Sequence, residues 1–502
     1  MLGEIRKTFQ KSAVYSLGNM SIKLIGLVLI PLYTNQEYLT VSDYGALGVL
    51  EITSQVMVAL MSLTLSQSLT RWFWDRDYIS RQKSIFFTSL VSLVVIAGVI
   101  LAATIPLSGN ISTLLFRSRE YGYIVTLMLI NSGLGVLFTQ VQTLLKLQAR
   151  ALWYSVVSII KLLITLLLTI YFIVYRHKTL DGIFEAQLIG TIAVMVLLLP
   201  YTIKNCTPKF ETKVIREMMV YSLPLMLASI TGVFFSVIDR YSLNYMEGLE
   251  RVGVYTLGYK ISSTLKVVII SSVQMALTPI LMKKINDPDN KWFYSRTLTY
   301  FSYGLMFCVI GLSLFSLEVI KVATRDAIYW ESANIVAILS FSFFFGMMKD
   351  TVFIGLSVVK RTRVAGTLIA ISSLVNLGLN ILLIPRFSIY GAATGTLIAQ
   401  LIFFIMILTA AQKWYRIPYE MNRIIWILTA GILLTGAGFL LNDVSIGLRL
   451  VLKTLLLLSY PFLLYLFRFH NQQELFHIRS IFHTWKNPSK LISNLKRLLL
   501  NK

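Results

Sequence analysis

The chain is a series of long apolar stretches separated by short polar connections. Each stretch is about as long as the roughly 20 residues that a helix needs to cross the hydrocarbon core of a bilayer. The pattern therefore predicts fourteen membrane-spanning helices. They cover residues 13–33, 46–69, 84–106, 123–145, 153–175, 182–201, 218–238, 252–280, 298–316, 332–355, 364–384, 390–411, 422–441 and 446–467.

Composition places the chain in the membrane. Apolar residues make up 56% of it and charged residues only 14%, whereas an ordinary soluble domain has about 25% charged residues. The fold class is therefore an all-α integral membrane protein. Two cysteines, Cys206 and Cys308, are too few for a disulfide framework, and no spacing of residues predicts a metal site or a cofactor.

The net charge of +23 also has a membrane explanation. Lysine and arginine lie mainly in short connections, and the connections on one side hold about three times as many as those on the other. Positive residues are enriched in cytoplasmic connections, so we expect both termini in the cytoplasm and the anionic inner leaflet as the partner, with no nucleic acid. The first span lacks a cleavage site of small residues, so we expect it to be retained.

Two parts of the chain are similar to each other. Tyr15-Ser16-Leu17 returns as Tyr221-Ser222-Leu223 at an offset of 206 residues, and Gly45 corresponds to Gly253 at an offset of 208. Chance similarity between apolar segments is the alternative. A true repeat predicts two parallel six-helix bundles around a central cavity, related by an axis along the membrane normal.

This repeat defines the expected domains. Residues 1–207 form an N-lobe of helices 1–6 and residues 208–415 a C-lobe of helices 7–12, followed by helices 13 and 14 in residues 416–468. Residues 469–502 are basic, with Leu491, Leu495, Leu498 and Leu499 at helical spacing. We expect this tail to be an amphipathic cytoplasmic helix on the inner leaflet.

Six lysines lie inside predicted spans: Lys23, Lys161, Lys260, Lys266, Lys349 and Lys453. A charged side chain at the bilayer centre costs about 2.5–3.5 kcal/mol on insertion scales, so such residues normally face a wet cavity. Lys23 and Lys266 are too deep to reach an interface easily, and we expect both to line a lumen. Lys260 lies two turns into its span and six residues from Lys266, so these two lysines point in different directions and a position against a neighbouring helix stays open for one of them. Lys161 and Lys453 lie about two turns from a helix end, where snorkelling is the favoured interpretation.

Acidic residues inside the spans suggest ion coupling or structural pairing. Glu51 and Asp350 are the candidates, and a salt bridge of Glu51 with Lys23 or Lys260 fits equally well. Asp350 follows Lys349 directly. Because successive helix positions do not face each other, we expect these two to need other partners.

A second charged pair, Asp239 and Arg240, falls at the predicted outer end of the seventh span. Interface water makes ionised side chains cheap there, so we expect a gate or a fold role for this pair rather than substrate contact. Arg71, at the end of the second span, is assigned the same role.

These motifs resemble a known family. The resemblance rests on residues 15–19, 30–34, 42–45, 71–73, 221–224, 239–241, 252–255, 380–385 and 390–393. In their order and spacing, they resemble the polysaccharide flippases of the multidrug/oligosaccharidyl-lipid/polysaccharide (MOP) exporter superfamily. The resemblance implies a MATE-like fold. It also favours a lumen position for Lys260, because these flippases place cationic groups on the first and eighth spans.

The same resemblance implies a function. The expected activity is alternating-access transport of a polyprenyl-pyrophosphate-linked oligosaccharide from the inner to the outer leaflet of a bacterial cytoplasmic membrane, for capsule or lipopolysaccharide. A proton or sodium ion is a candidate coupling partner, and a polysaccharide polymerase is a candidate protein partner.

The chemistry of such a substrate agrees with the buried cations. Sugar hydroxyls without partners in hydrocarbon each cost a few kcal/mol, so a polar lumen is needed. A pyrophosphate is a compact anion that lysine ammonium groups can bind. The predicted substrate-binding residues are Lys23, Lys260, Lys266, Lys349, Asn19 and Gln55.

Two other functions remain open. An antiporter for drugs or organic cations would be expected to line its cavity with carboxylates and aromatic rings, whereas lysines outnumber acids in these spans. A membrane glycan polymerase or ligase would need a long outer loop, and no connection carries a recognisable catalytic pattern. We therefore expect a transporter and not an enzyme.

Overall fold

The computed structural model describes residues 26–467 and 469, which form helices and connections and contain no strand. Twelve helices in this part of the chain are long and apolar enough to cross a membrane. The all-α membrane fold is thus confirmed, but the count of fourteen is not. Residues 13–25 of the first predicted span lie outside the described residues, and the eleventh and twelfth spans are joined in one element, α17 (Thr362–Trp414).

Most predicted spans coincide with a helix. After the short α2 (Ile30–Tyr33), the N-terminal helices are α3 (Val41–Ser62), α4 (Leu65–Trp72), α5 (Gln82–Thr104), α6 (Ser108–Phe116), α7 (Gly122–Leu147), α8 (Ala151–Ile170) and α9 (Leu180–Lys204), with a 3₁₀ turn η1 (Arg76–Arg81) and a π segment η2 (Tyr171–Tyr175). The later ones are α10 (Thr212–Glu247), α11 (Leu249–Thr264), the π segment η3 (Leu265–Ile270), α12 (Ser271–Lys283), the turn η4 (Lys284–Asn286), α13 (Asn290–Leu314), α14 (Ser316–Ala323), the turn η5 (Ala327–Glu331), α15 (Ser332–Val352), α16 (Ile354–Val358), α17, α18 (Met421–Phe439) and α19 (Ile446–Leu466).

The second predicted span is not one continuous helix. It begins with a capping box on Thr40 and Asp43, and it breaks between α3 and α4, where Leu63 and Thr64 have φ angles of 42° and 52°. Side chains with a Cβ rarely adopt this left-handed conformation. The break is held by α10, because the Thr64 hydroxyl donates to the carbonyl of Ser222, 3.1 Å away. Apolar periodicity carries no sign of such a break.

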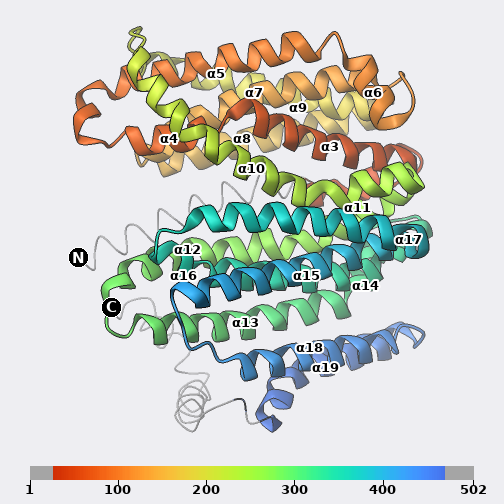
Figure 1. Cartoon of the computed structure of the whole chain (residues 1–502). Helices are drawn as coiled ribbons and strands as arrows, with labels where there is room; N and C mark the ends of the chain where they lie inside the picture. Colours follow the sequence, from red (N-terminus) through yellow and green to blue (C-terminus); the bar gives the residue numbers. More distant parts are fainter. Residues whose placement is uncertain (1–25, 468, 470–502) are drawn as a thin grey trace, which may run out of the picture. The chain divides into compact units, whose positions relative to one another are not determined.

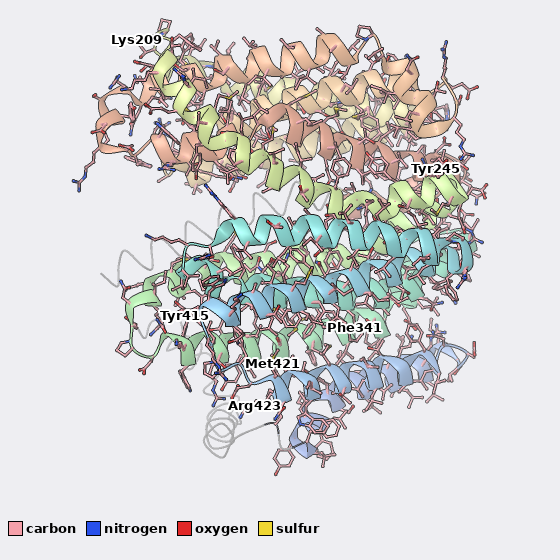
Figure 2. The ribbon with its side chains drawn as sticks, viewed as in Figure 1. Lys209, Tyr245, Phe341, Tyr415, Met421 and Arg423 are labelled. Atoms are coloured by element: carbon pink, nitrogen blue, oxygen red, sulfur yellow. The ribbon has the colours of Figure 1, made fainter. Side chains whose placement is uncertain are left out.

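Helix α10 is longer than predicted, with 36 residues instead of the 21 in 218–238. It lies between the N-terminal helices and the first half of α17 (Figure 1). Figure 2 shows Lys209, just before α10, and Tyr245, near its end, at opposite ends of this helix. The extra turns carry polar residues that hydropathy had assigned to a connection.

Helix α17 is a hairpin of two helical segments. At Ser388 the backbone has φ 50° and ψ −129°, which interrupts the helix. The second segment then returns close along the first. Glycine permits this approach, because a Cβ at Gly391 would collide with the carbonyl of Leu383, and one at Gly395 would contact Asn380. The hairpin therefore contains both predicted spans 364–384 and 390–411.

Close contact between α3 and α11 supports the predicted repeat. A Cβ at Gly253 would lie 2.5 Å from the carbonyl oxygen of Val41, and one at Gly45 would collide with the carbonyl of Leu249. Gly45 and Gly253 differ by 208 in residue number, and so do Val41 and Leu249. The contact of Gly45 with Leu249 is therefore the repeat-related equivalent of the contact of Gly253 with Val41. Such reciprocity is typical of a two-fold axis between equivalent helices.

Side chains on the outer helices are apolar where they have no protein neighbours. Val99 of α5, Leu167 of α8 and Val196 of α9 are each more than 60% exposed. The opposite faces pack into a core around Met61, Phe86, Leu144 and other N-terminal residues. Apolar surface on both faces is what a helix in lipid requires, because acyl chains replace water.

The chain divides into two compact units. The larger one contains residues 11–285 and 316–416, and the smaller one contains residues 286–315 with 417–502, besides residues 1–10. In the smaller unit, Glu420 accepts a hydrogen bond from Thr299 at 2.9 Å and pairs with Arg296 at 3.3 Å. The predicted lobe boundaries at 207 and 415 stay predictions, and the predicted amphipathic tail, 469–502, lies outside the described residues apart from Phe469.

We expect Gly253→Ala to destabilise the protein. The added methyl group would meet the backbone of α3, which cannot move aside as a flexible side chain could, and such overpacking costs about 1–3 kcal/mol. The melting temperature of the purified protein in detergent should fall. The matched control is Gly98→Ala, because a Cβ at Gly98 in α5 would meet no atom within 4 Å. Equal melting temperatures for the two variants would contradict the close contact.

Candidate functional site

Lys260 forms an ion pair inside the membrane-spanning part of the larger unit. Its Nζ lies 2.9 Å from Oε1 of Glu51, joining α11 to α3. Nζ also lies 5.3 Å from the ring centroid of Tyr44 and 5.9 Å from that of Tyr33. The sequence left two salt bridges open for Glu51, one with Lys23 and one with Lys260. The described residues contain the one with Lys260. The ammonium is held by a carboxylate and by two aromatic rings.

The ion pair is not completely buried. The side chain of Lys260 is 15% exposed and that of Glu51 is 35% exposed. A Cβ placed on Gly26 would lie 4.0 Å from Nζ, which is an ordinary van der Waals distance, so Gly26 lies close to the ammonium.

Lys349 and Asp350 correct one expectation from the sequence. They do pair with each other, with Nζ 3.0 Å from Oδ1. Successive residues of a helix point in different directions, but the lysine side chain is long enough to reach its neighbour here, near the end of α15. Asp350 also accepts a hydrogen bond of 3.2 Å from Gln274 of α12, and Lys349 lies 4.8 Å from the ring centroid of Phe403.

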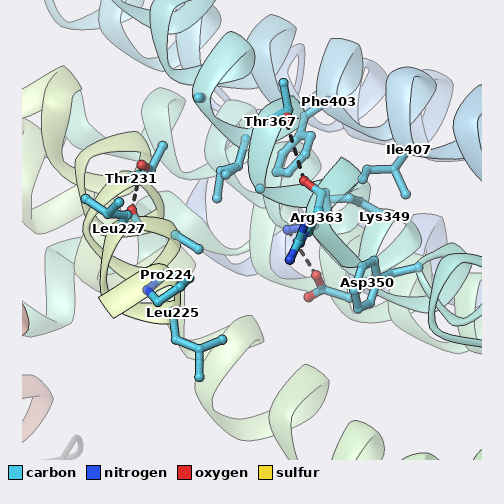
Figure 3. A pocket seen from close by; sticks show the side chains of 16 residues that line it. Pro224, Leu225, Leu227, Thr231, Lys349, Asp350, Arg363, Thr367, Phe403 and Ile407 are labelled. Carbon is cyan, nitrogen blue, oxygen red and sulfur yellow. Dashed lines mark hydrogen bonds and ion pairs between the residues drawn. The ribbon is translucent and has the colours of Figure 1, made fainter. Parts of the chain in front are cut away.

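This pair lies at the edge of a cavity of about 750 Å³ (Figure 3). We name it the inner cavity, because its end of the helices is the one predicted to face the cytoplasm. Figure 3 shows Pro224, Leu225, Leu227 and Thr231 of α10 on one side, and Lys349, Asp350, Arg363, Phe403 and Ile407 on the other. The walls are otherwise mainly apolar.

Two positive charges and one negative charge therefore border the inner cavity. Arg363, in the first turn of α17, is exposed and has no ion pair among the described residues. Asp350 partly neutralises Lys349 at 3.0 Å, and no carboxylate does the same for Arg363. The cavity thus presents a net positive edge beside an apolar wall.

Asp239 and Arg240 are buried, which contradicts the expected contact with interface water. They are 1% and 5% exposed. Because α10 continues to Glu247, the pair lies two turns inside the helix. The Oδ1 atom of Asp239 accepts from the backbone N and the Nε of Arg240, and the guanidinium carbon lies 4.0 Å from the ring centroid of Tyr259.

The other carboxylate oxygen of Asp239 faces two hydroxyl groups. Tyr255 of α11 donates to Oδ2 at 2.6 Å, and Thr396 of α17 donates at 3.5 Å. A half-exposed carboxylate could be hydrated by water, but the buried carboxylate of Asp239 accepts its hydrogen bonds from residues of α10, α11 and α17. Burying a carboxylate is tolerable only with partners of this kind.

Two buried asparagines of α17 lie near the helices that bond this carboxylate. Asn376 donates to the carbonyl of Phe235 in α10 at 3.3 Å. One helical turn further on, Oδ1 of Asn380 would lie 2.9 Å from a Cβ at Gly395, the neighbour of Thr396. Both asparagines are fully buried, yet Oδ1 of Asn376 and both amide atoms of Asn380 have no hydrogen-bond partner. Orphaned buried polar atoms are rare in folded proteins and indicate a missing ligand or water.

The cluster of Asp239, Tyr255, Asn376, Asn380 and Thr396 could therefore hold a hard cation. It offers carboxylate, amide and hydroxyl oxygens, the ligands that such cations prefer. Among the described residues, no group of three or more His, Cys, Asp or Glu residues could hold a metal ion. A single carboxylate suits a monovalent ion better than a divalent one.

The remaining predicted residues are not brought together. Lys266 lies in the π segment η3 and is exposed, without an ion pair among the described residues. Gln55 is exposed on α3, and Arg71 lies over the rings of Trp72 and Tyr221. Lys23 and Asn19 lie outside the described residues.

Sequence reasoning missed the partners of Asp239 and the role of Arg363. Asn376 and Asn380 are one helical turn apart in an apolar span, and this spacing was the available signal. Polar residues at this interval share one helix face and are costly in lipid. Arg363 had been assigned to a connection, so only the packing of α17 shows that it borders a cavity.

Comparisons with known proteins give a family for this chain and a fold that it shares. Residues 8–284 match the model of a family described as polysaccharide biosynthesis protein. An uncharacterized membrane protein of Methanocaldococcus jannaschii is 25% identical over 293 residues, which is 55% of this chain and 55% of that protein. The chain thus aligns with about half the length of the curated relative that it matches.

Solved structures share the fold at low sequence identity. The lipid II flippase MurJ in an inward closed conformation superposes with a TM-score of 0.71 at 13% identity, covering 91% of this chain and 100% of that chain. An inward-facing multidrug resistance MATE transporter of the MOP superfamily gives 0.65 at 13% identity, covering 83% and 96%. A MOP superfamily transporter from Pyrococcus furiosus, whose binding pocket is described as reversed in polarity, gives 0.63 at 12% identity, covering 84% and 97%.

The family model matches more than half of the chain, and the fold is shared with the lipid II flippase MurJ and with MATE transporters. The chain belongs to the polysaccharide biosynthesis protein family.

Proposed function

We propose that the protein is a flippase for lipid-linked oligosaccharides. It moves polyprenyl-pyrophosphate-linked repeat units from the inner to the outer leaflet of a bacterial cytoplasmic membrane by alternating access, for surface polysaccharide biosynthesis. The family match supports the pathway. The inner cavity is the observation that carries the substrate class, because it combines a positive edge with an apolar wall.

The inner cavity suits an amphiphilic anion. Arg363 and Lys349 can bind phosphate oxygens, and arginine does so through paired hydrogen bonds. Leu225, Ile369 and Ile407 supply an apolar wall for the prenyl units next to the phosphate. A cavity of about 750 Å³ lies within the roughly 300–1,000 Å³ typical of ligand sites, so it receives the head of the lipid and not its whole chain.

Lys260 is the second proposed phosphate contact. Glu51 pairs with Lys260 and holds it in place while no anion is present, so the ammonium does not stand unpaired in the membrane. A pyrophosphate carries more charge than one carboxylate and can compete for the same ammonium. Lys23, Lys266, Asn19 and Gln55 remain predicted contacts.

The membrane potential favours the proposed direction. With the cell interior negative, outward movement of an anion gains about 2.3 kcal/mol per charge per 100 mV. The return of a positively charged empty site is then the step that a coupled cation could drive. The Asp239 cluster is the proposed cation site, because the side-chain oxygens of Asn376 and Asn380 have no hydrogen-bond partner among the described residues. Asp239, Glu51 and Asp350 each pair with a basic side chain, so these free amide oxygens distinguish the Asp239 cluster.

A multidrug antiporter is the second candidate, supported by the fold shared with MATE transporters. An organic cation would meet two positive groups and one negative group at the inner cavity. This charge balance opposes it. A glycan polymerase or ligase is disfavoured by the sequence, because none of the predicted outer connections is long.

Deletion of the gene should trap lipid-linked oligosaccharide in the inner leaflet. The headgroup cannot cross hydrocarbon unaided, because many hydroxyl groups would lose their partners. Leaflet distribution can be measured by access of an impermeant glycan-labelling reagent to intact and to opened cells. A polymerase defect would instead leave single units facing outward, and unchanged glycan with increased drug sensitivity would support the antiporter.

Neutralising the inner cavity should reduce export. We expect the double variant K349Q/R363Q to lower the rate of glycan export about tenfold or more, since hydrogen bonds to charged groups contribute about 1.5–3 kcal/mol each. The matched control is Arg386→Gln, which removes a positive charge from an exposed position near the turn of α17. Equal loss in both variants would point to net charge rather than to the cavity.

Sodium should stabilise the purified protein through the Asp239 cluster. A ligand that binds only the folded state raises the melting temperature with its concentration. We expect NaCl to raise it relative to choline chloride at the same ionic strength, and Asn380→Leu to remove this difference. A sodium effect that persists in Asn380→Leu would place the cation elsewhere, and no effect of sodium in the unaltered protein would leave the proton as the coupling ion.

A further inference from the structure

A second cavity, of about 1,070 Å³, lies at the opposite end of α10 from the inner cavity. Its walls come from the end of α6, the last turns of α10 and the first segment of α17. We name it the outer cavity, after the side that its end of the helices is predicted to face. All of its lining residues belong to the larger unit.

Polar contacts hold α6 against α10 at this cavity. Arg117, with φ 56°, donates from Nη2 to the carbonyl of Tyr245 at 3.0 Å, and its guanidinium carbon lies 5.6 Å from the centroid of the Tyr245 ring. Asn244 donates to the carbonyl of Leu115 at 2.7 Å. The polar wall is therefore built before any ligand arrives.

The same wall keeps hydrogen-bonding capacity unused. Glu247 accepts from the hydroxyl of Ser388 through Oε2. Asn244 donates through its NH₂ group, and its side-chain oxygen accepts no hydrogen bond from the residues that the structure describes. Tyr245 is 75% exposed although Arg117 lies over its ring, so most of the ring surface is open to a ligand. Acceptors, a guanidinium donor and an open aromatic face thus occur together.

We propose that the outer cavity binds sugar units of the transported glycan. A sugar ring has hydroxyl groups at its edge and apolar C–H groups on its faces, so it suits polar side chains beside an aromatic ring. Tyr245 stacks on one ring, and Arg117, Asn244 and Glu247 bind hydroxyls. The volume exceeds the roughly 300–1,000 Å³ range of small-ligand sites, which fits more than one sugar.

The charge of the cavity favours sugar over lipid phosphate. Arg117 is matched by Glu247, so the lining has no net charge, whereas the inner cavity has a positive edge. A phosphate near Arg117 would also meet the carboxylate of Glu247 and be repelled. The inference rests on the proposed function: phosphate binds at the inner cavity, and the glycan contacts the outer one as it leaves.

The test uses the glycan of the cell itself. Mild acid releases the oligosaccharide from the lipid-linked precursor that accumulates in cells lacking the protein. Binding of this oligosaccharide to the full-length protein in nanodiscs is measured by saturation-transfer NMR and titration. We expect Tyr245→Ala to raise the Kd about tenfold and Tyr245→Phe to leave it nearly unchanged, because the ring and not the hydroxyl makes the contact.

Controls separate the site from the fold and from the proposed function. Tyr245 is exposed, so equal melting temperatures should show that both variants fold, and Glu247→Gln should weaken binding independently. No accumulation of precursor would contradict the proposed function and the inference with it. Accumulation of precursor without binding of the oligosaccharide would overturn the inference alone, and so would equal Kd values for the unaltered protein and Tyr245→Ala. Displacement of the bound oligosaccharide by polyprenyl phosphate that carries no sugar would also overturn it.

Discussion

The structure depends on one constraint: a polar group inside the membrane must find its partner within the protein. Glu51 and Lys260 meet across two helices, and Asp239 collects bonds from Arg240 and Tyr255. In water each of these groups would form hydrogen bonds with solvent, whether or not the chain was folded. In hydrocarbon an unpaired one would cost several kcal/mol, so each pair also fixes which helices are neighbours.

Close backbone approach is the second requirement of this setting. Acyl chains are as apolar as leucine, so helices gain little from hiding apolar surface and depend on tight packing instead. The reciprocal contact of Gly45 and Gly253 provides it between α3 and α11. Because this contact is symmetric, it is also a place where two equivalent halves can be joined without a large polar interface.

The two cavities lie toward opposite ends of α10 and of the first segment of α17, and they differ in chemistry. The inner cavity combines positive charge with apolar walls, and the outer cavity combines balanced charge with tyrosine rings. Between them, α10 and α17 are bonded through Thr231 and Ser373 and through Phe235 and Asn376. The buried Asp239 cluster lies next to these contacts, where a bound cation could bias the packing of the two helices.

Sequence by itself determined the all-helical membrane fold, nearly all helix positions and the repeat, because lipid imposes a length and a polarity on every span. It also placed Glu51, Lys260, Lys349 and Asp350 within spans, and the structure has all four in helices. It did not reveal the break at Leu63 and Thr64, the burial of Asp239 or the pairing of Lys349 with Asp350. Those depend on which side chains from distant helices come within a few ångströms of one another, and only the tertiary structure decides that distance.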